Sequence, residues 1–189
     1  MQTGTRKTWR TALRDAAIVG SVASLTSLAA MSAHCRRENG SVWAAVNAPS
    51  HWIWGNPALG QHRPSVRYTV AGVLVHHLSS GFWALIHTQS LRPFEPGHSL
   101  GAHVAGAGLI TALAAAVDLA VVPHRLTPGF QHHLSAKALF GVYAMFGIGL
   151  LAGTLFTAAR DRRRLRAEET KLRSTNKRKT GHEGVTHDG

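Results

Sequence analysis

Ionisable side chains inside long apolar segments are the residues of this sequence that could do chemistry. One apolar segment contains His76, His77 and His87, and the next contains His103 and Asp118. Placing such groups in a bilayer is costly, so each of them is a candidate functional residue. An imidazole changes its charge near neutral pH and is a common metal ligand, and a carboxylate can accept a proton from it.

The spacing of the polar residues in the first of these segments predicts a single helical face. Offsets of 4, 7 and 11 residues return to nearly the same angle around an α-helix. The face consists of His76, Ser80, Trp83 and His87. We expect it to point into a helix bundle. If neighbouring segments run antiparallel, His87 lies at the depth of His103, and Asp118 lies within about two turns of the depth of His76.

Three interpretations of these residues remain open. The favoured one is structural, with neutral histidines as interhelical hydrogen-bond partners that each contribute about 0.6–2 kcal/mol. In the second, Asp118 with His76 or His77 forms a proton or ion path. In the third, His87 and His103 bind a metal or ligate a haem between facing helices. The sequence has no H-E-x-x-H motif and only one cysteine, so we expect no cofactor.

Further histidines fall outside the apolar segments. Six of them lie on the outer side of the membrane in the orientation predicted below: His34, His51, His62, His124, His132 and His133. A cluster of them, with His51 and His124 as candidates, could bind zinc or copper at the outer face. The chain has 13 histidines, so chance placement in loops is the favoured explanation.

Four apolar segments must position these groups. Residues 16–33, 68–91, 99–122 and 138–159 hold 18, 24, 24 and 22 residues. About 20 helical residues cross a bilayer core of about 30 Å. The sequence therefore predicts an all-α protein, a four-helix transmembrane bundle.

Basic residues predict the orientation of this bundle. The net charge is +12, and 14 of the 21 basic residues lie in the two termini. With both termini inside, 15 basic residues are inside and six outside, as the positive-inside rule requires. We expect a basic cytoplasmic N-terminus (1–15), a transmembrane domain (16–159) and a basic, largely disordered cytoplasmic tail (160–189). This placement of charge does not indicate nucleic-acid binding, and a cleaved signal peptide is the alternative for the first segment.

Small residues at spacing four predict close helix packing. The three stripes are Ala16, Gly20 and Ser24; Gly108, Ala112, Ala116 and Ala120; and Gly149 and Gly153, continued by Thr157. Packing within the chain is the favoured interpretation. A homo-oligomer that forms through Gly149 and Gly153 is the alternative.

The first loop and the tail carry the remaining expectations. We expect a short interfacial helix over Val42–Ala48, an extended Ala48 before Pro49, and His51–Trp54 on the outer surface. The alternative is a lid over a site between the helices. The tail is expected to stay helical to about Leu172 and to attract anionic lipid headgroups at about 1 kcal/mol per basic residue.

Motifs of several enzyme classes are missing from the sequence. There is no G-x-S-x-G nucleophile elbow, no Walker A sequence and no Gly-rich dinucleotide motif. The sequence therefore favours a non-enzymatic protein.

Three sequence runs together resemble a known group of proteins. They are Asn47–Gly55 (NAPSHWIWG), His76–Ala84 (HHLSSGFWA) and Val121–Phe130 (VVPHRLTPGF). Over about residues 12–160 the chain is similar to small uncharacterised four-span inner-membrane proteins of proteobacteria. The resemblance implies the fold and a bacterial inner-membrane location, and it implies no activity.

These observations order three functional hypotheses. The first is a non-enzymatic accessory or envelope-stress factor that acts through helix contacts in the membrane. The second is a small transporter or a proton or metal conduit that uses the intramembrane histidines and Asp118. The third is a membrane-bound haem or metal protein.

Overall fold

The described residues of this computed structural model, 9–91 and 99–183, are helices and short connections without a β-strand. Three regions for which the sequence made predictions lie outside the described residues. They are the N-terminal residues 1–8, the loop at Arg92 and the end of the tail. Four helical segments are long and apolar enough to cross a membrane. They are Trp9–Asn39, Val66–Ser90, Leu100–Val121 and Ala136–Ser174. The chain is therefore a multi-pass membrane protein, as the apolar segments predict.

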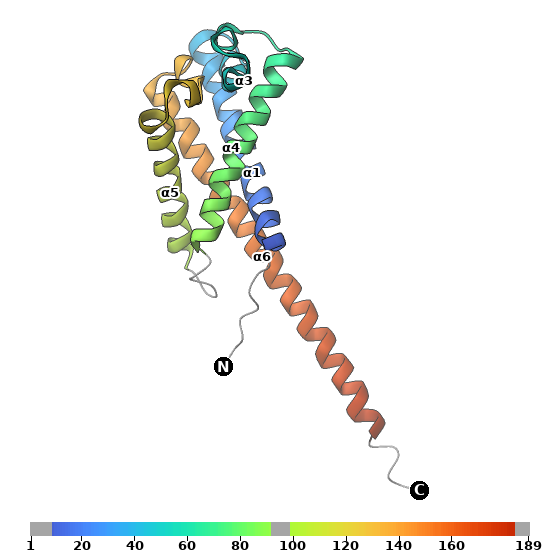
Figure 1. Ribbon diagram of the computed structural model, residues 1–189. Coiled ribbons are helices and arrows are strands. Elements are labelled where there is room, and N and C mark those ends of the chain that lie inside the picture. Colours follow the sequence, from blue (N-terminus) through green and yellow to red (C-terminus); the bar gives the residue numbers. More distant parts are fainter. Residues whose placement is uncertain (1–8, 92–98, 184–189) are drawn as a thin grey trace. The chain divides into compact units, whose positions relative to one another are not determined.

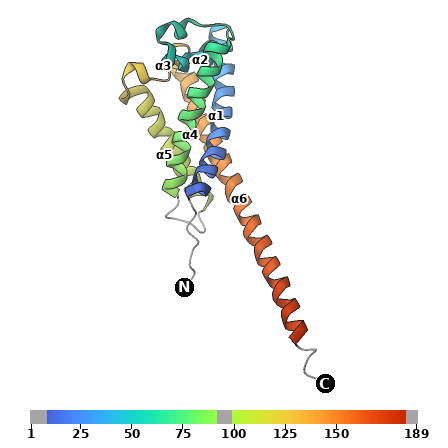
Figure 2. The same ribbon diagram turned by 45° about the vertical axis from the view of Figure 1, so that its right-hand side comes forward.

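The structure divides into two units, Met1–Thr154 and Leu155–Gly189. The first contains helices α1 (Trp9–Asn39), α4 (Ala71–Leu91) and α5 (Leu100–Ala116), together with the first part of α6 (Ala136–Glu183). Figures 1 and 2 show α1, α4 and α5 side by side, with the loop that joins α1 to α4 at one end of them. We call this the loop end of the bundle.

Glycines allow the helices to approach one another closely. A Cβ on Gly20 of α1 would lie 2.7 Å from the Cα of Gly81 in α4. On α6, a Cβ on Gly149 would lie 2.5 Å from the Cα of Ala23, and one on Gly153 would lie 2.8 Å from the Cα of Val19. Both α6 glycines therefore pack against α1 within the chain. This is the favoured interpretation of their spacing.

The expectation for the small residues of the third segment was wrong. Gly108 has open space around it, and Ala112, Ala116 and Ala120 are exposed. The buried side of α5 carries Ala107, Ile110 and Ala114 instead. Spacing alone marks a face of a helix, but it does not determine which face the neighbouring helices cover.

The bundle interior holds two apolar clusters. The middle cluster contains Val19, Ala23, Trp83, Ala84, Ala107, Ile110, Ala114, Phe146 and Leu150. The cluster at the loop end contains Met31, Cys35, Ala44, Ala45, Ala48, Phe130, Leu134, Ala138 and Val142. The loops therefore have a packed core of their own.

The first loop is more helical than expected. Helical turns α2 (Ala44–Asn47), η1 (Ala48–Ser50) and α3 (His51–Trp54) follow one another, and Ala48 is helical rather than extended (φ −54°, ψ −43°). Pro49 lies in the first turn of η1, where its missing N–H leaves no hydrogen bond unmade.

Buried Asn47 fixes this loop on the helical turn Val66–Val70, which leads into α4. Its amide donates to the carbonyls of Gln61 (3.0 Å) and Arg63 (2.9 Å). Its Oδ1 accepts from the hydroxyl of Thr69 at 2.7 Å. Because every polar group of this side chain is satisfied, Asn47 can be fully buried and still stabilise the fold.

The second unit is the C-terminal part of α6, which is helical to Glu183 rather than to about Leu172. Its sequence is rich in Arg, Lys and Glu, which have high helix propensity. A salt bridge of 2.7 Å joins Glu169 to Arg173, one turn later. The expected disorder after Leu172 is therefore not observed in the described part of the tail.

Candidate functional site

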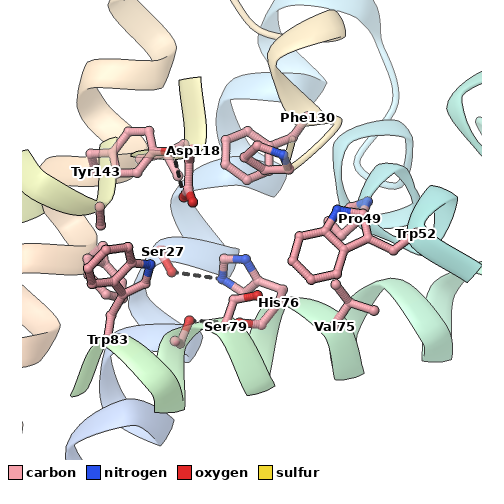
Figure 3. A pocket seen from close by; sticks show the side chains of 15 residues that line it. Ser27, Pro49, Trp52, Val75, His76, Ser79, Trp83, Asp118, Phe130 and Tyr143 are labelled. Carbon is pink, nitrogen blue, oxygen red and sulfur yellow. Dashed lines mark hydrogen bonds between the residues drawn. The ribbon is translucent and has the colours of Figure 1, made fainter. Parts of the chain in front are cut away.

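A cavity of about 50 Å³ lies among the helices of the first unit, next to the loop end (Figure 3). Its polar lining consists of Ser27, His76, Ser79, Ser80, Asp118 and Tyr143. Its apolar lining includes Pro49, Trp52, Val75, Trp83, Ala114, Pro128, Phe130 and Phe146. One water needs about 10–15 Å³ of such space, so the cavity has room for a few waters or one small molecule.

Asp118 provides the carboxylate of the cavity. It lies in a π-helical turn, Val117–Val121, that continues α5, and such turns are frequent at functional sites. The hydroxyl of Tyr143 on α6 donates to Oδ2 of Asp118 at 3.0 Å. Among the described residues no Lys or Arg forms a salt bridge with this carboxylate. The group is therefore a half-buried acid without a counter-charge in that part of the chain.

His76 provides the imidazole of the cavity. Its Nε2 lies 3.0 Å from the hydroxyl of Ser27, and that hydroxyl donates to the carbonyl of Ala23 at 2.7 Å. Since the serine hydrogen is committed to the carbonyl, we assign the imidazole proton to Nε2, which leaves Nδ1 as an acceptor in the neutral ring. Figure 3 shows His76 and Asp118 on facing sides of the pocket.

The loops cover the cavity at the loop end of the bundle. Pro49 and Trp52 come from the first loop, and Phe130 comes from the loop before α6 and meets the ring of His76 edge-on at 6.5 Å. The indole N–H of Trp52 donates to the carbonyl of Thr127 at 2.8 Å, which ties the two loops together. The first loop is thus placed as the lid interpretation expected, while Trp52 keeps 36% of its surface exposed.

A close contact at Gly129 joins the same two loops. Its φ of +83° favours glycine, and a Cβ there would lie 2.7 Å from Nδ1 of His51. His51 is only 2% exposed, with Nδ1 2.9 Å from the carbonyl of Ala48. The expectation that His51 lies on the outer surface was therefore wrong, because this side chain is part of the packing between the loops.

The cavity brings together only some of the residues selected from the sequence. His76, Ser80 and Asp118 line it, and buried Ser80, Trp83 and His87 confirm that their helical face points into the bundle. His77 does not line the cavity and contacts the hydroxyl of Ser21 at 3.5 Å instead.

His87 and His103 also lie outside this cavity. Nε2 of His87 is 3.1 Å from the hydroxyl of Thr154, so one ring nitrogen that a haem or metal would need already has a partner. In the described ranges, no three His, Cys, Asp or Glu side chains are close enough together to hold a metal ion.

Two residues central to the site were not selected from the sequence. Tyr143 and Ser27 are each hydrogen-bonded to a candidate group, but both occur in apolar runs and resemble packing residues there. One signal was available for Tyr143. It lies well inside an expected span, and a buried tyrosine hydroxyl needs a partner.

Four of the six histidines that were candidates for a metal cluster form two pairs. The rings of His62 and His133 meet edge-on with centroids 5.6 Å apart, and those of His124 and His132 are also 5.6 Å apart. Burial lowers the pKa of His133 below its ordinary value of 6.5, and the neighbouring His62 lowers it further.

Comparisons with known proteins identified no relative of this chain. No family model matches the chain, and no match was found among curated proteins or among solved structures. The fold and the site by themselves define a multi-pass, all-helical membrane protein with a polar cavity at one end of its bundle.

Proposed function

We propose that this protein is a non-enzymatic accessory factor of the bacterial inner membrane that binds a small polar molecule in the cavity at Asp118 and His76. The observation that carries the proposal is the cavity itself, which combines a carboxylate that no Lys or Arg contacts among the described residues with an imidazole beneath two loops. Polar groups are retained at such depth in a membrane protein when they have a function.

The distribution of charge supports an outward-facing cavity. Basic residues are concentrated in both termini, so the positive-inside rule favours both termini in the cytoplasm. Pro49 and Trp52 follow α1, and Phe130 follows α5, so these lining residues lie at the opposite end of the spans. With this orientation the ligand comes from the outer side of the membrane.

The geometry favours a binding site over a conduit. A conduit needs polar groups along the whole depth of the bundle. The cavity instead ends on Trp83, Ala114 and Phe146, which belong to the middle apolar cluster. Neither His87 nor His103 lines it. We therefore propose that a bound ligand changes the helix contacts of the protein, and that it does not cross the membrane here.

Thiol labelling tests access to the cavity. In a Cys35→Ala background, Trp52→Cys places the only thiol of the chain in the lining, at a position that is 36% exposed and so open to a reagent larger than the cavity. A membrane-impermeant maleimide should label it in spheroplasts. Exposed Ser90, near the other end of α4, provides the matched control, because Ser90→Cys should react only in inverted vesicles. Labelling of Trp52→Cys only from the cytoplasmic side, or from neither side, would contradict the proposal.

A further inference from the structure

The lining of the cavity indicates the charge of its ligand. Tyr143 donates to one oxygen of Asp118, and the other oxygen has no partner among the described residues. A carboxylate in a membrane interior is costly without a positive charge beside it. A cation in the cavity would remove this cost, because no Lys or Arg lines it.

The other lining groups suit a cation that carries N–H donors. His76 presents an acceptor nitrogen in the neutral tautomer assigned above. The rings of Trp83, Phe130 and Tyr143 surround the same space, and their negative faces attract cations. The cavity thus combines a carboxylate, a neutral acceptor and aromatic faces.

The size of the cavity limits the cation. About 50 Å³ corresponds to roughly three to five groups of the size of a water molecule. Ammonium, methylammonium and ethanolammonium fit this limit, and the larger choline does not. Tetramethylammonium has no N–H to donate to Asp118. A metal ion fits the lining less well, because in the described part of the chain no three ligating side chains converge.

We propose that the cavity binds a primary ammonium group, with the carboxylate of Asp118 as its counter-ion and Nδ1 of His76 as a second acceptor. The inference rests on the proposed function, since it names the ligand class of the same site. Such a group occurs in free amines and in the headgroup of phosphatidylethanolamine. Trp52 and Pro49 at the rim are placed to contact the rest of either molecule.

Calorimetric titration of the full-length protein in phosphatidylglycerol nanodiscs tests the chemistry. We expect saturable binding of ethanolamine and methylammonium at pH 7.5, and no binding of tetramethylammonium. Asp118→Asn should weaken binding at least tenfold. Asp15→Asn is the matched control, because Asp15 is also a buried aspartate but pairs with Arg14 at 2.7 Å, and it should leave the affinity unchanged.

A second variant and a second lipid complete the test. Ser79→Leu keeps the carboxylate but fills the cavity, and it should abolish binding even if Asp118→Asn does not fold. Nanodiscs that contain phosphatidylethanolamine distinguish the two sources. A lipid headgroup in the site lowers the apparent affinity for ethanolamine severalfold, and a site for free amines gives the same affinity in both bilayers.

Two outcomes would overturn the inference. One is the absence of saturable amine binding in phosphatidylglycerol, and the other is undiminished binding in a folded Asp118→Asn variant or in Ser79→Leu. If Trp52→Cys is nevertheless labelled from the outer side, the proposed function stands and only the ammonium ligand is wrong. If the cavity cannot be labelled either, both proposals fail.

Discussion

Asp118 and Tyr143 show how one hydrogen bond keeps an acid inside an apolar bundle. The tyrosine hydroxyl is the only partner of the carboxylate among the described residues, and it comes from another helix. The bond therefore fixes α5 against α6 as well as the acid itself. Losing the donor would leave a polar group unsatisfied, which costs more than the bond contributes on average.

Tyr143→Phe should destabilise the protein, because it removes this donor and leaves the aromatic ring and its packing in place. We expect the free energy of unfolding to fall by about 1–3 kcal/mol, measured by denaturant titration in mixed micelles. Tyr68→Phe is the matched control, since the Tyr68 hydroxyl forms no hydrogen bond with the residues that the structure describes, and it should be neutral. Equal stability of the two variants would show that the contact with Asp118 contributes nothing.

His133 makes the loop end sensitive to acid. Its pKa is below 6.5 in the folded protein and about 6.5 in the unfolded chain, so between these values the unfolded chain binds more protons. Its contribution is fully present above about pH 6.5 and is lost as the pH falls through the lower, folded value. Thermal unfolding between pH 8 and 5 should therefore show a fall in Tm.

His133→Gln should reduce this fall in Tm, because glutamine does not titrate. His124→Gln is the control at an exposed histidine of the same face, and it should retain the pH dependence of the wild-type protein. The assignment to His133 fails if both variants keep the full slope.

At the scale of the elements, glycine contacts determine which helices meet. Gly149 and Gly153 lie directly against α1, whereas Gly108 on α5 meets nothing within 4 Å. A methyl group at either α6 position must move a backbone, and overpacking of this kind costs about 1–3 kcal/mol.

Gly153→Ala and Gly149→Ala should each therefore lower the stability by about this amount, measured by unfolding in sodium dodecyl sulfate. Gly108→Ala should leave the stability unchanged or raise it by up to about 1 kcal/mol, because alanine has the higher helix propensity. If all three substitutions changed the stability by the same amount, the close contact of α6 with α1 at Gly149 and Gly153 would be contradicted.

The sequence predicted which segments are helices better than it predicted which side of each helix is buried. Four spans follow from length and hydropathy, and the face of His76, Ser80, Trp83 and His87 follows from helical spacing. The rotation of α5 was not predictable, because its sequence is mostly apolar and small residues occur on its exposed side as well as on its buried side. The pairing of Asp118 with Tyr143 depends on that rotation.

At the scale of the whole molecule, the cavity forms where distant parts of the chain meet. The three runs Asn47–Gly55, His76–Ala84 and Val121–Phe130 each contribute to its lining. They lie far apart in the sequence, and a sequence pattern cannot show that two loops close over one end of a bundle. The helices position the polar side chains of the cavity, and the loops cover the end of the bundle at which the cavity lies.

The orientation of the bundle decides the biological setting of this site. With both termini in the cytoplasm, a fluorescent protein fused to the C-terminus should fluoresce, and alkaline phosphatase fused after Thr127 should be active. The physical reason is the excess of basic residues in the two termini, which resist translocation. Fusion of alkaline phosphatase after Ser90, near the opposite end of α4, is the control and should be inactive. The reverse pattern would turn the cavity towards the cytoplasm, and its ligand would then have to be a cytoplasmic amine rather than one from the outer side.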